Sequence, residues 1–315
     1  MRLMHGLRFA VGTLSVFPVR VERADREVAG RAMTLAPLVG LTLGAVAGLP
    51  LGLPAPALLG AALAIGLLAV LTRGLHLDGL ADLADGLGSG KPADQALDIM
   101  KKSDIGPFGV MALVFTLLVQ VAALAEAGFA ALVTACVAGR LALTWACRAS
   151  VPAARTDGLG ATVAGTVRPS APWLVTLAAL LASAAFGLSA DCRVWDGGPA
   201  ALAREAAAWY AGSDARDLPP GLRYGDAAIY VEPIEIDEPP ALGGMASSSS
   251  LPPGKAGLGL PAFLALPLGL LTGLAAALLL LRRTTRRLGG ITGDVLGALV
   301  ETATAATLVA CALLG

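Results

Sequence analysis

Charged residues are scarce in this chain of 315 residues, because Asp, Glu, Lys and Arg together make up only 15% of it. An average soluble domain has about 25%. Lys and Arg equal Asp and Glu at 23 each, so no excess positive charge exists to neutralise the phosphates of a nucleic acid. We therefore expect no nucleic acid as a partner. Sparse charge combined with 56% hydrophobic residues also excludes disorder for most of the chain.

Aromatic residues, histidines and cysteines are few as well. Aromatic residues make up 4% of the chain, and only two histidines are present. The four cysteines are Cys136, Cys147, Cys192 and Cys311, and none forms a C-x-x-C pair. This spacing excludes a disulfide framework and a cysteine-type zinc site.

Alanine, leucine and glycine dominate what remains. The mean hydropathy is +0.74, and the 39 glycines suit membrane helices, whose backbones approach closely where side chains are small. The composition therefore predicts an all-α fold, a polytopic integral membrane helix bundle.

Seven apolar runs approach the length of about 20 residues that crosses a bilayer. These predicted spans are residues 35–53, 55–72, 107–125, 127–147, 172–190, 258–281 and 295–314. With the N-terminus in the cytoplasm, most of the 23 Lys and Arg residues fall in cytoplasmic segments, as the positive-inside rule requires. We therefore expect a multi-pass protein in the lipid bilayer, and a homo-oligomer remains open.

Residues 191–257 interrupt this pattern, because they contain no spanning run and include all three tyrosines. We expect a polar insert between spans five and six, with membrane parts at 1–190 and 258–315. Within the insert, residues 204–210 are predicted to form a short helix. The acidic, proline-rich residues 230–240 are predicted to be extended or disordered.

The segment 75–86 carries the clearest sign of chemistry. Asp78, Asp82 and Asp85 stand at i, i+4 and i+7 and therefore share one helix face. Stacked carboxylates repel one another unless a cation lies among them, and hard oxygen ligands favour Mg²⁺ or Mn²⁺, especially a metal that also holds a substrate phosphate. The alternative is a solvated acidic face. The adjacent His76 is either a ligand or proton carrier, or a helix-cap or packing residue.

Two further polar loops contain basic residues. Lys101 and Lys102 lie in the loop 99–109 and either bind phosphate or anchor the chain at the membrane boundary. Arg155 lies in the glycine-rich loop 152–160, where the backbone is free to approach a ligand closely.

A fourth loop follows the basic run 282–287. It contains the candidate ligand-binding residues Gly290, Thr292, Gly293 and Asp294. Glycine amides beside a basic cluster can cradle phosphates. Asp294 is a candidate helix N-cap and a candidate metal ligand, and the two roles are not exclusive. All four loops are cytoplasmic in the predicted topology, so we expect one cytoplasmic site for a phosphorylated substrate and a divalent metal.

Two charges, Arg140 and Glu301, lie within apolar runs. Charges inside a membrane are costly and usually face a partner or a cavity. A structural ion pair between these two residues is one explanation.

Two motifs together resemble the cobalamin synthase family, the adenosylcobinamide-GDP ribazoletransferases. They are His76-Leu77-Asp78-Gly79-Leu80-Ala81-Asp82 through Asp85-Gly86, and Gly289-Gly290-Ile291-Thr292-Gly293-Asp294. The resemblance covers the chain outside 191–257. The family's loop before span three commonly reads Met-Lys-Asp-Ser-Arg-Ile-Gly, whereas this chain has Lys102 and Asp104 at the Asp and Arg positions. The charges are thus exchanged.

The resemblance implies the last step of nucleotide-loop assembly in a bacterial inner membrane. The hydroxyl of α-ribazole, or of its 5′-phosphate, attacks the cobinamide-bearing phosphorus of adenosylcobinamide-GDP, and GMP leaves. The resemblance also implies Mg²⁺, which Asp78, Asp82 and Asp85 would hold. One aspartate, Asp85 by preference, would accept the hydroxyl proton. His76, Lys101, Asp104, Arg155 and the 289–294 loop are the predicted substrate contacts.

Two other functions are compatible with parts of the pattern. A CDP-alcohol phosphotransferase of phospholipid synthesis also uses stacked aspartates and Mg²⁺, but it normally has an Ala-Arg pair after its first Asp-Gly, whereas here Ala81 precedes Asp82. A cation-coupled transporter would place its carboxylates near the bilayer midplane. Here they lie at the end of a predicted span.

Overall fold

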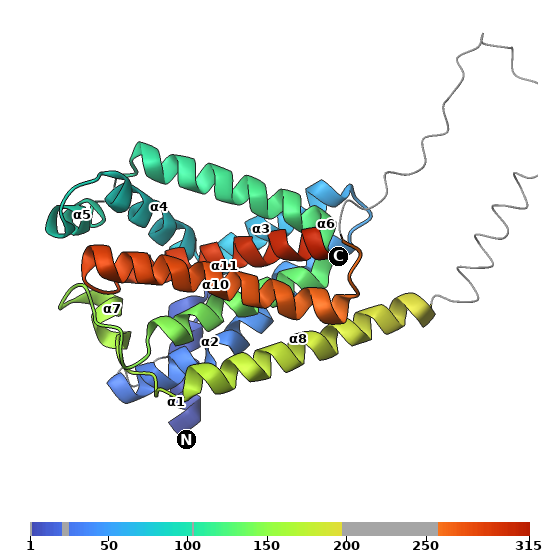
Figure 1. Ribbon diagram of the computed structural model, residues 1–315, viewed down its shortest axis with the longest axis horizontal. Coiled ribbons are helices and arrows are strands. Elements are labelled where there is room, and N and C mark those ends of the chain that lie inside the picture. The colour runs from blue at the N-terminus through green and yellow to red at the C-terminus, as the bar shows by residue number, and fades with distance from the viewer. Residues whose placement is uncertain (1, 21–24, 103, 197–257) are drawn as a thin grey trace, which may run out of the picture. The chain divides into compact units, whose positions relative to one another are not determined.

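The computed structural model describes residues 2–20, 25–102, 104–196 and 258–315. The named elements in these ranges are helices (Figure 1), with only two isolated β-bridges among them. The helices are α1 (Arg2–Leu14), α2 (Arg26–Ala47), the 3₁₀ turn η1 (Leu49–Gly52), α3 (Ala57–Leu71), α4 (Leu75–Gly88), α5 (Ala93–Ile99), α6 (Pro107–Ala146), α7 (Gly158–Val163), α8 (Ala171–Asp196), α10 (Ala262–Leu288) and α11 (Gly293–Leu314). The predicted all-α class is confirmed.

Five helical segments are long and apolar enough to cross a membrane: α2 with η1, α6, α8, α10 and α11. Helices α3 and α4 meet this criterion together but are bent by 89° between them. We take α3 as the membrane crossing. The bend then turns α4 and its aspartates out of the span.

Helix α6 folds back on itself at Gly128, which has non-helical torsions of φ 74° and ψ −169°. Its 40 residues would extend about 60 Å, roughly twice the hydrocarbon thickness. Gln120, before the break, donates a 2.8 Å hydrogen bond to Glu301 of α11. The carbonyl of Ala135, after the break, accepts one from Thr304 of the same helix. Both arms therefore lie along α11. The seven spans stay a prediction, since five helical segments, or six with the bent α3–α4 pair, meet the criterion of length and hydropathy.

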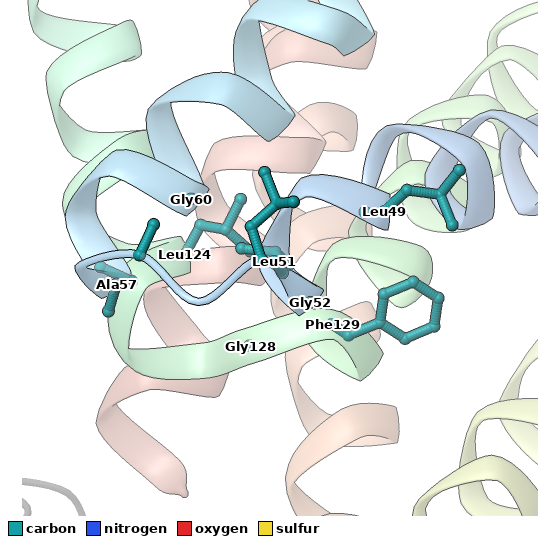
Figure 2. Close-up of a pocket in the computed structure, with 12 residues that line it drawn as sticks. Leu49, Leu51, Gly52, Ala57, Gly60, Leu124, Gly128 and Phe129 are labelled. Atoms are coloured by element: carbon teal, nitrogen blue, oxygen red, sulfur yellow. The ribbon is translucent and has the colours of Figure 1, made fainter.

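The turn at Gly128 lies beside η1 and the start of α3 (Figure 2). A cavity of about 420 Å³ opens there. Glycine, alanine, leucine and phenylalanine line it. None of the residues that line this cavity has a side chain suited to acid, base or metal chemistry.

Two helices extend beyond the predicted spans. Helix α2 begins at Arg26, because the Asp25 side chain accepts a hydrogen bond from the backbone N–H of Val28 and caps it. Helix α10 continues to Leu288, through the basic run that follows the predicted span 258–281. Basic side chains stabilise the C-terminal end of a helix dipole, and Gly289, at φ 83°, ends the helix in the left-handed conformation.

Residues 1–191 and 257–315 form one compact unit. The predicted polar insert, including the proposed helix at 204–210, lies outside the described residues apart from the last turn of α8. The three cysteines with described side chains, Cys136, Cys147 and Cys311, are buried and free.

The predicted Arg140–Glu301 pair does not form a direct contact. Glu301 accepts its hydrogen bond from Gln120, and no ion pair between the two charges occurs in the described part of the chain. Arg140 is 1% exposed, and its Nε and Nη2 atoms have no hydrogen-bond partner.

Candidate active site

Four polar segments meet at one end of the bundle. They are α4, the loop before α6, the segment 152–160 and the turn between α10 and α11. Figure 1 shows α4, α5, α7 and the α10–α11 turn gathered at that end. The sequence separates α4 from the α10–α11 turn by about 200 residues or more, so the convergence of these segments is a product of the fold.

Asp85 joins α4 to the start of α6. Its Oδ2 accepts a 2.7 Å hydrogen bond from the N–H of Gly106, and its Oδ1 accepts one of 2.9 Å from Gly109. These are orphan amides at a helix N-terminus, where a carboxylate is favourable. A Cβ at Gly106 would lie 2.5 Å from Oδ1, so the two glycines make room for this contact. Asp85 thus positions α6, with both of its oxygens engaged.

Asp78 and Asp82 lie one helical turn apart on α4, with Asp78 exposed and Asp82 half-buried. Burial, followed by the negative charges of Asp78, Asp294 and Asp85, raises the pKa of Asp82 to about 7. The positive charge of Arg155 acts in the opposite direction. The carboxylates of α4 and α11 therefore act on one another across a shared space, and a cation in that space would relieve their repulsion.

Arg155 and Asp294 bring two loops together, because Nη1 of Arg155 lies 3.8 Å from Oδ2 of Asp294. Arg155 also donates to the carbonyl of Leu97 at the end of α5, while its buried Nε has no partner. The prediction that Asp294 caps α11 is wrong. Thr292 is the cap, and its hydroxyl accepts from the N–H of Val295 at 3.2 Å. The Asp294 carboxylate, which accepts from the Thr292 hydroxyl, is therefore not used as the cap.

Glycines permit the close approach of these segments. A Cβ at Gly79 would lie 2.7 Å from the carbonyl oxygen of Asp294, and one at Gly297 would lie 3.1 Å from the backbone of His76. Gly290 packs against residues 152–154 in the same way, since a Cβ there would lie 2.5 Å from Pro152 and Ala154 backbone atoms. Gly290 therefore shapes the loop, whereas Gly293 lines the cavity itself.

A cavity of about 270 Å³ opens among these elements. Its polar lining comprises His76, Asp78, Arg155, Asp157, Thr292 and Asp294. His76 is 3% exposed, and neither ring nitrogen has a hydrogen-bond partner. Burial and then the charge of Arg140 lower the pKa of His76, so its imidazole is neutral at pH 7.

Lys101 and Asp104, the two predicted substrate contacts in the 99–109 loop, have different surroundings in the structure. Nζ of Lys101 lies 3.9 Å from Oδ2 of Asp157, which lines the cavity. Asp104 is exposed and makes no recorded hydrogen bond or ion pair to the other candidate residues. Sequence reasoning gave no role to Asp157, although it directly precedes the Gly158-Leu159-Gly160 run.

A magnesium ion at this site would be only partly coordinated by protein. No group of three His, Cys, Asp or Glu side chains within the described ranges is arranged to hold a metal ion alone. Mg²⁺ commonly takes one or two carboxylates and completes its shell with water and substrate phosphates. Asp78 and Asp82 would supply such oxygens, and Asp294 is close enough to affect the pKa of Asp82.

The sequence of this chain is similar to one family over most of its length. The cobalamin-5-phosphate synthase family matches residues 6–215 and 238–312. This match includes much of 191–257, so the view that the whole insert lies outside the resemblance is wrong, and only 216–237 stay unmatched within it.

Two relatives match nearly end to end. An adenosylcobinamide-GDP ribazoletransferase of Frankia casuarinae is 37% identical, over 99% of this chain and 95% of the relative. The enzyme of the same name from a Nocardioides species is 35% identical, over 97% of both chains. No solved structure matches. Because of the family match and these two alignments, we conclude that the chain belongs to the cobalamin-5-phosphate synthase family.

Proposed function

We propose that this protein is an adenosylcobinamide-GDP ribazoletransferase. It would transfer the cobinamide phosphate of adenosylcobinamide-GDP to α-ribazole or its 5′-phosphate and release GMP. The carrying observation is that Asp78, Asp294 and Arg155 line one cavity, with Asp82 beside it, in a chain of this family. Two full-length relatives bear the name of this activity.

The transfer forms one P–O bond and breaks another. The acceptor hydroxyl oxygen bonds to the cobinamide-bearing phosphorus, the bond to the GMP oxygen breaks, and GMP leaves with the electron pair. Such a reaction depends on positioning and on stabilising negative charge. Arg155 supplies a fixed positive charge, and its buried Nε has a free donor for a phosphate oxygen.

Asp78 and Asp82 would hold Mg²⁺ beside the diphosphate, with Asp294 facing them. When bound, the ion would supply charge neutralisation on the leaving phosphate. Asp85 was the preferred proton acceptor and a third metal ligand from the sequence. Because both of its oxygens accept backbone hydrogen bonds, we assign it instead to positioning α6.

His76 is the proposed acceptor for the hydroxyl proton. Its imidazole is neutral, lines the cavity and has no partner on either nitrogen. A general base must reach the proton that it removes, and His76 is placed at the cavity where the acceptor hydroxyl would enter.

The site would open to the cytoplasm of a bacterial cell. Several long apolar helices make this a multi-pass membrane protein. The four arginines at the end of α10 (Arg282, Arg283, Arg286 and Arg287) lie beside the turn that leads to Thr292. By the positive-inside rule, that end of the bundle faces the cytoplasm.

The decisive experiment is an assay of purified protein in liposomes with adenosylcobinamide-GDP, with and without α-ribazole. We expect GMP release and a cobalamin product only when both substrates are present. A properly inserted protein that releases no GMP would overturn the proposal. The alternative, a CDP-alcohol phosphotransferase, would instead release CMP from a CDP-alcohol lipid precursor in the same preparation.

A further inference from the structure

The end of α10 borders a second hollow that is separate from the candidate active site. Its volume is about 470 Å³. One wall comes from Trp145, Arg148 and Ser150, and the other from Leu278, Arg282 and Thr285. We call this hollow the arginine groove. None of its lining residues also lines the cavity that contains Asp78 and Asp294.

The side chains around the arginine groove are of the kind expected where a bilayer meets water. Trp173, at the start of α8, is 68% exposed and packs edge-on against Trp145, with ring centroids 4.8 Å apart. Tryptophan is enriched at this level of membrane proteins. One turn before Arg282 and Arg283, Leu279 is 67% exposed, as expected of a side chain that faces lipid.

No carboxylate among the described residues neutralises the positive charge of the groove. Arg148 stacks over the ring of Trp145 at 5.6 Å and donates to the Ser150 hydroxyl at 3.0 Å. Arg282 also borders another hollow, next to the arginine groove, which Arg283, Arg286 and Arg287 line as well. Within the part of the chain that the structure describes, no carboxylate lies within 4.0 Å of these arginines.

We propose that the arginine groove binds the headgroup of an anionic phospholipid. Guanidinium groups match the geometry of phosphate oxygens, and Arg148 and Arg282 stand on opposite walls with the Ser150 and Thr285 hydroxyls beside them. Leu278 and Leu281 continue the groove as an apolar wall suited to an acyl chain. Basic pockets between membrane helices on the cytoplasmic side bind anionic headgroups. Without the two arginines, the uncharged side chains of the groove would not distinguish an anionic lipid from a zwitterionic one.

The test measures retained lipid by native mass spectrometry, which is independent of enzymatic activity. Protein in detergent is exposed to equal amounts of phosphatidylglycerol and phosphatidylcholine. The groove variant is Arg148→Gln/Arg282→Gln. The control, Arg20→Gln/Arg168→Gln, removes two exposed arginines that line neither hollow.

We expect the wild type and the control to retain phosphatidylglycerol in preference to phosphatidylcholine. The groove variant should bind phosphatidylglycerol roughly 30-fold more weakly than the wild type. Arg282→Gln alone should bind it roughly fivefold more weakly, because each arginine near an anionic headgroup contributes about 1 kcal/mol of attraction. The single variant keeps the Arg148–Trp145 contact and serves if the double variant fails to fold.

Three results would overturn the proposal. Equal loss in the groove and control variants would mean that only overall charge matters. Absence of headgroup preference in the wild type would mean that no site exists. Displacement of bound phosphatidylglycerol by millimolar inorganic phosphate would assign the groove to a soluble phosphate. None of these results bears on the proposed transferase activity, which the GMP-release assay tests separately.

Discussion

Gly79 of α4 lies directly against the backbone of Asp294 at the start of α11, where a Cβ on Gly79 would approach the Asp294 carbonyl oxygen to 2.7 Å. This contact joins the two most specific sequence motifs, which are more than 200 residues apart. It places Asp78 and Asp82 beside Asp294, so the negative charge of α11 affects the pKa of Asp82.

Gly79→Ala should therefore separate α4 from α11. Backbone atoms of Asp294 cannot rotate away as a side chain can, so we expect a loss of about 1–3 kcal/mol in the free energy of unfolding together with lost activity. The matched control is Gly66→Ala on α3, where nothing lies within 4 Å of the added methyl group. The control should be neutral or slightly stabilising. Thermal unfolding in detergent measures both, and equal behaviour of the two variants would contradict this packing.

Asp82→Asn should strongly reduce turnover without harming the fold. Removing one preorganised charge from a phosphotransfer site costs about 10²–10³ in rate, whereas loss of a like charge beside Asp78 relieves repulsion. Asp98→Asn on α5, an exposed residue, is the control and should keep wild-type activity. GMP release by membrane-inserted protein is the measurement. An Asp82→Asn variant with normal turnover would remove Asp82 from the site.

Asp85→Asn should instead lower the stability of the fold and largely preserve turnover. An asparagine has one acceptor oxygen, so the N–H of either Gly106 or Gly109 would lose its partner, at a cost of about 1–3 kcal/mol in folding free energy. Turnover per folded molecule should stay within about tenfold of wild type. A variant with wild-type thermal stability but turnover reduced as in Asp82→Asn would instead restore Asp85 to the metal-binding role predicted from sequence.

The response to Mg²⁺ should depend on pH. A pKa of about 7 for Asp82 means that this carboxyl is mostly protonated at pH 6 and ionised at pH 8. Metal binds the ionised form and must displace the proton. The Mg²⁺ concentration for half-maximal GMP release should thus rise up to about tenfold per unit below pH 7 and level off above pH 8. The same half-maximal concentration at pH 6 and pH 8 would contradict this expectation.

The membrane bundle and the site were predictable to different degrees. Apolar runs of spanning length are local, so the helical class and the polar loops could be read directly. The N-terminal boundary of α2 could not, because its polar first turn is capped by Asp25 outside the apolar run. The predicted span ends at residue 281 with the apolar run, whereas the helix continues through 282–287, since arginine is a good helix former.

The roles within the site depend on contacts that sequence spacing cannot show. The i, i+4, i+7 pattern grouped Asp78, Asp82 and Asp85 as equals. Only the fold shows that Asp85 turns to the N–H groups of Gly106 and Gly109. Asp294 was recognised as a possible ligand, but its proximity to Arg155 required the pairing of two distant loops.

Direct metal binding tests the central claim, that the carboxylates of α4 and α11 form one divalent-metal site for the diphosphate. Mn²⁺ replaces Mg²⁺, and its free signal is followed by electron paramagnetic resonance as purified protein is added with adenosylcobinamide-GDP. We predict that the wild type and Asp98→Asn bind Mn²⁺ equally, and that Asp82→Asn binds it at least tenfold more weakly. Equal binding by all three proteins would contradict the account.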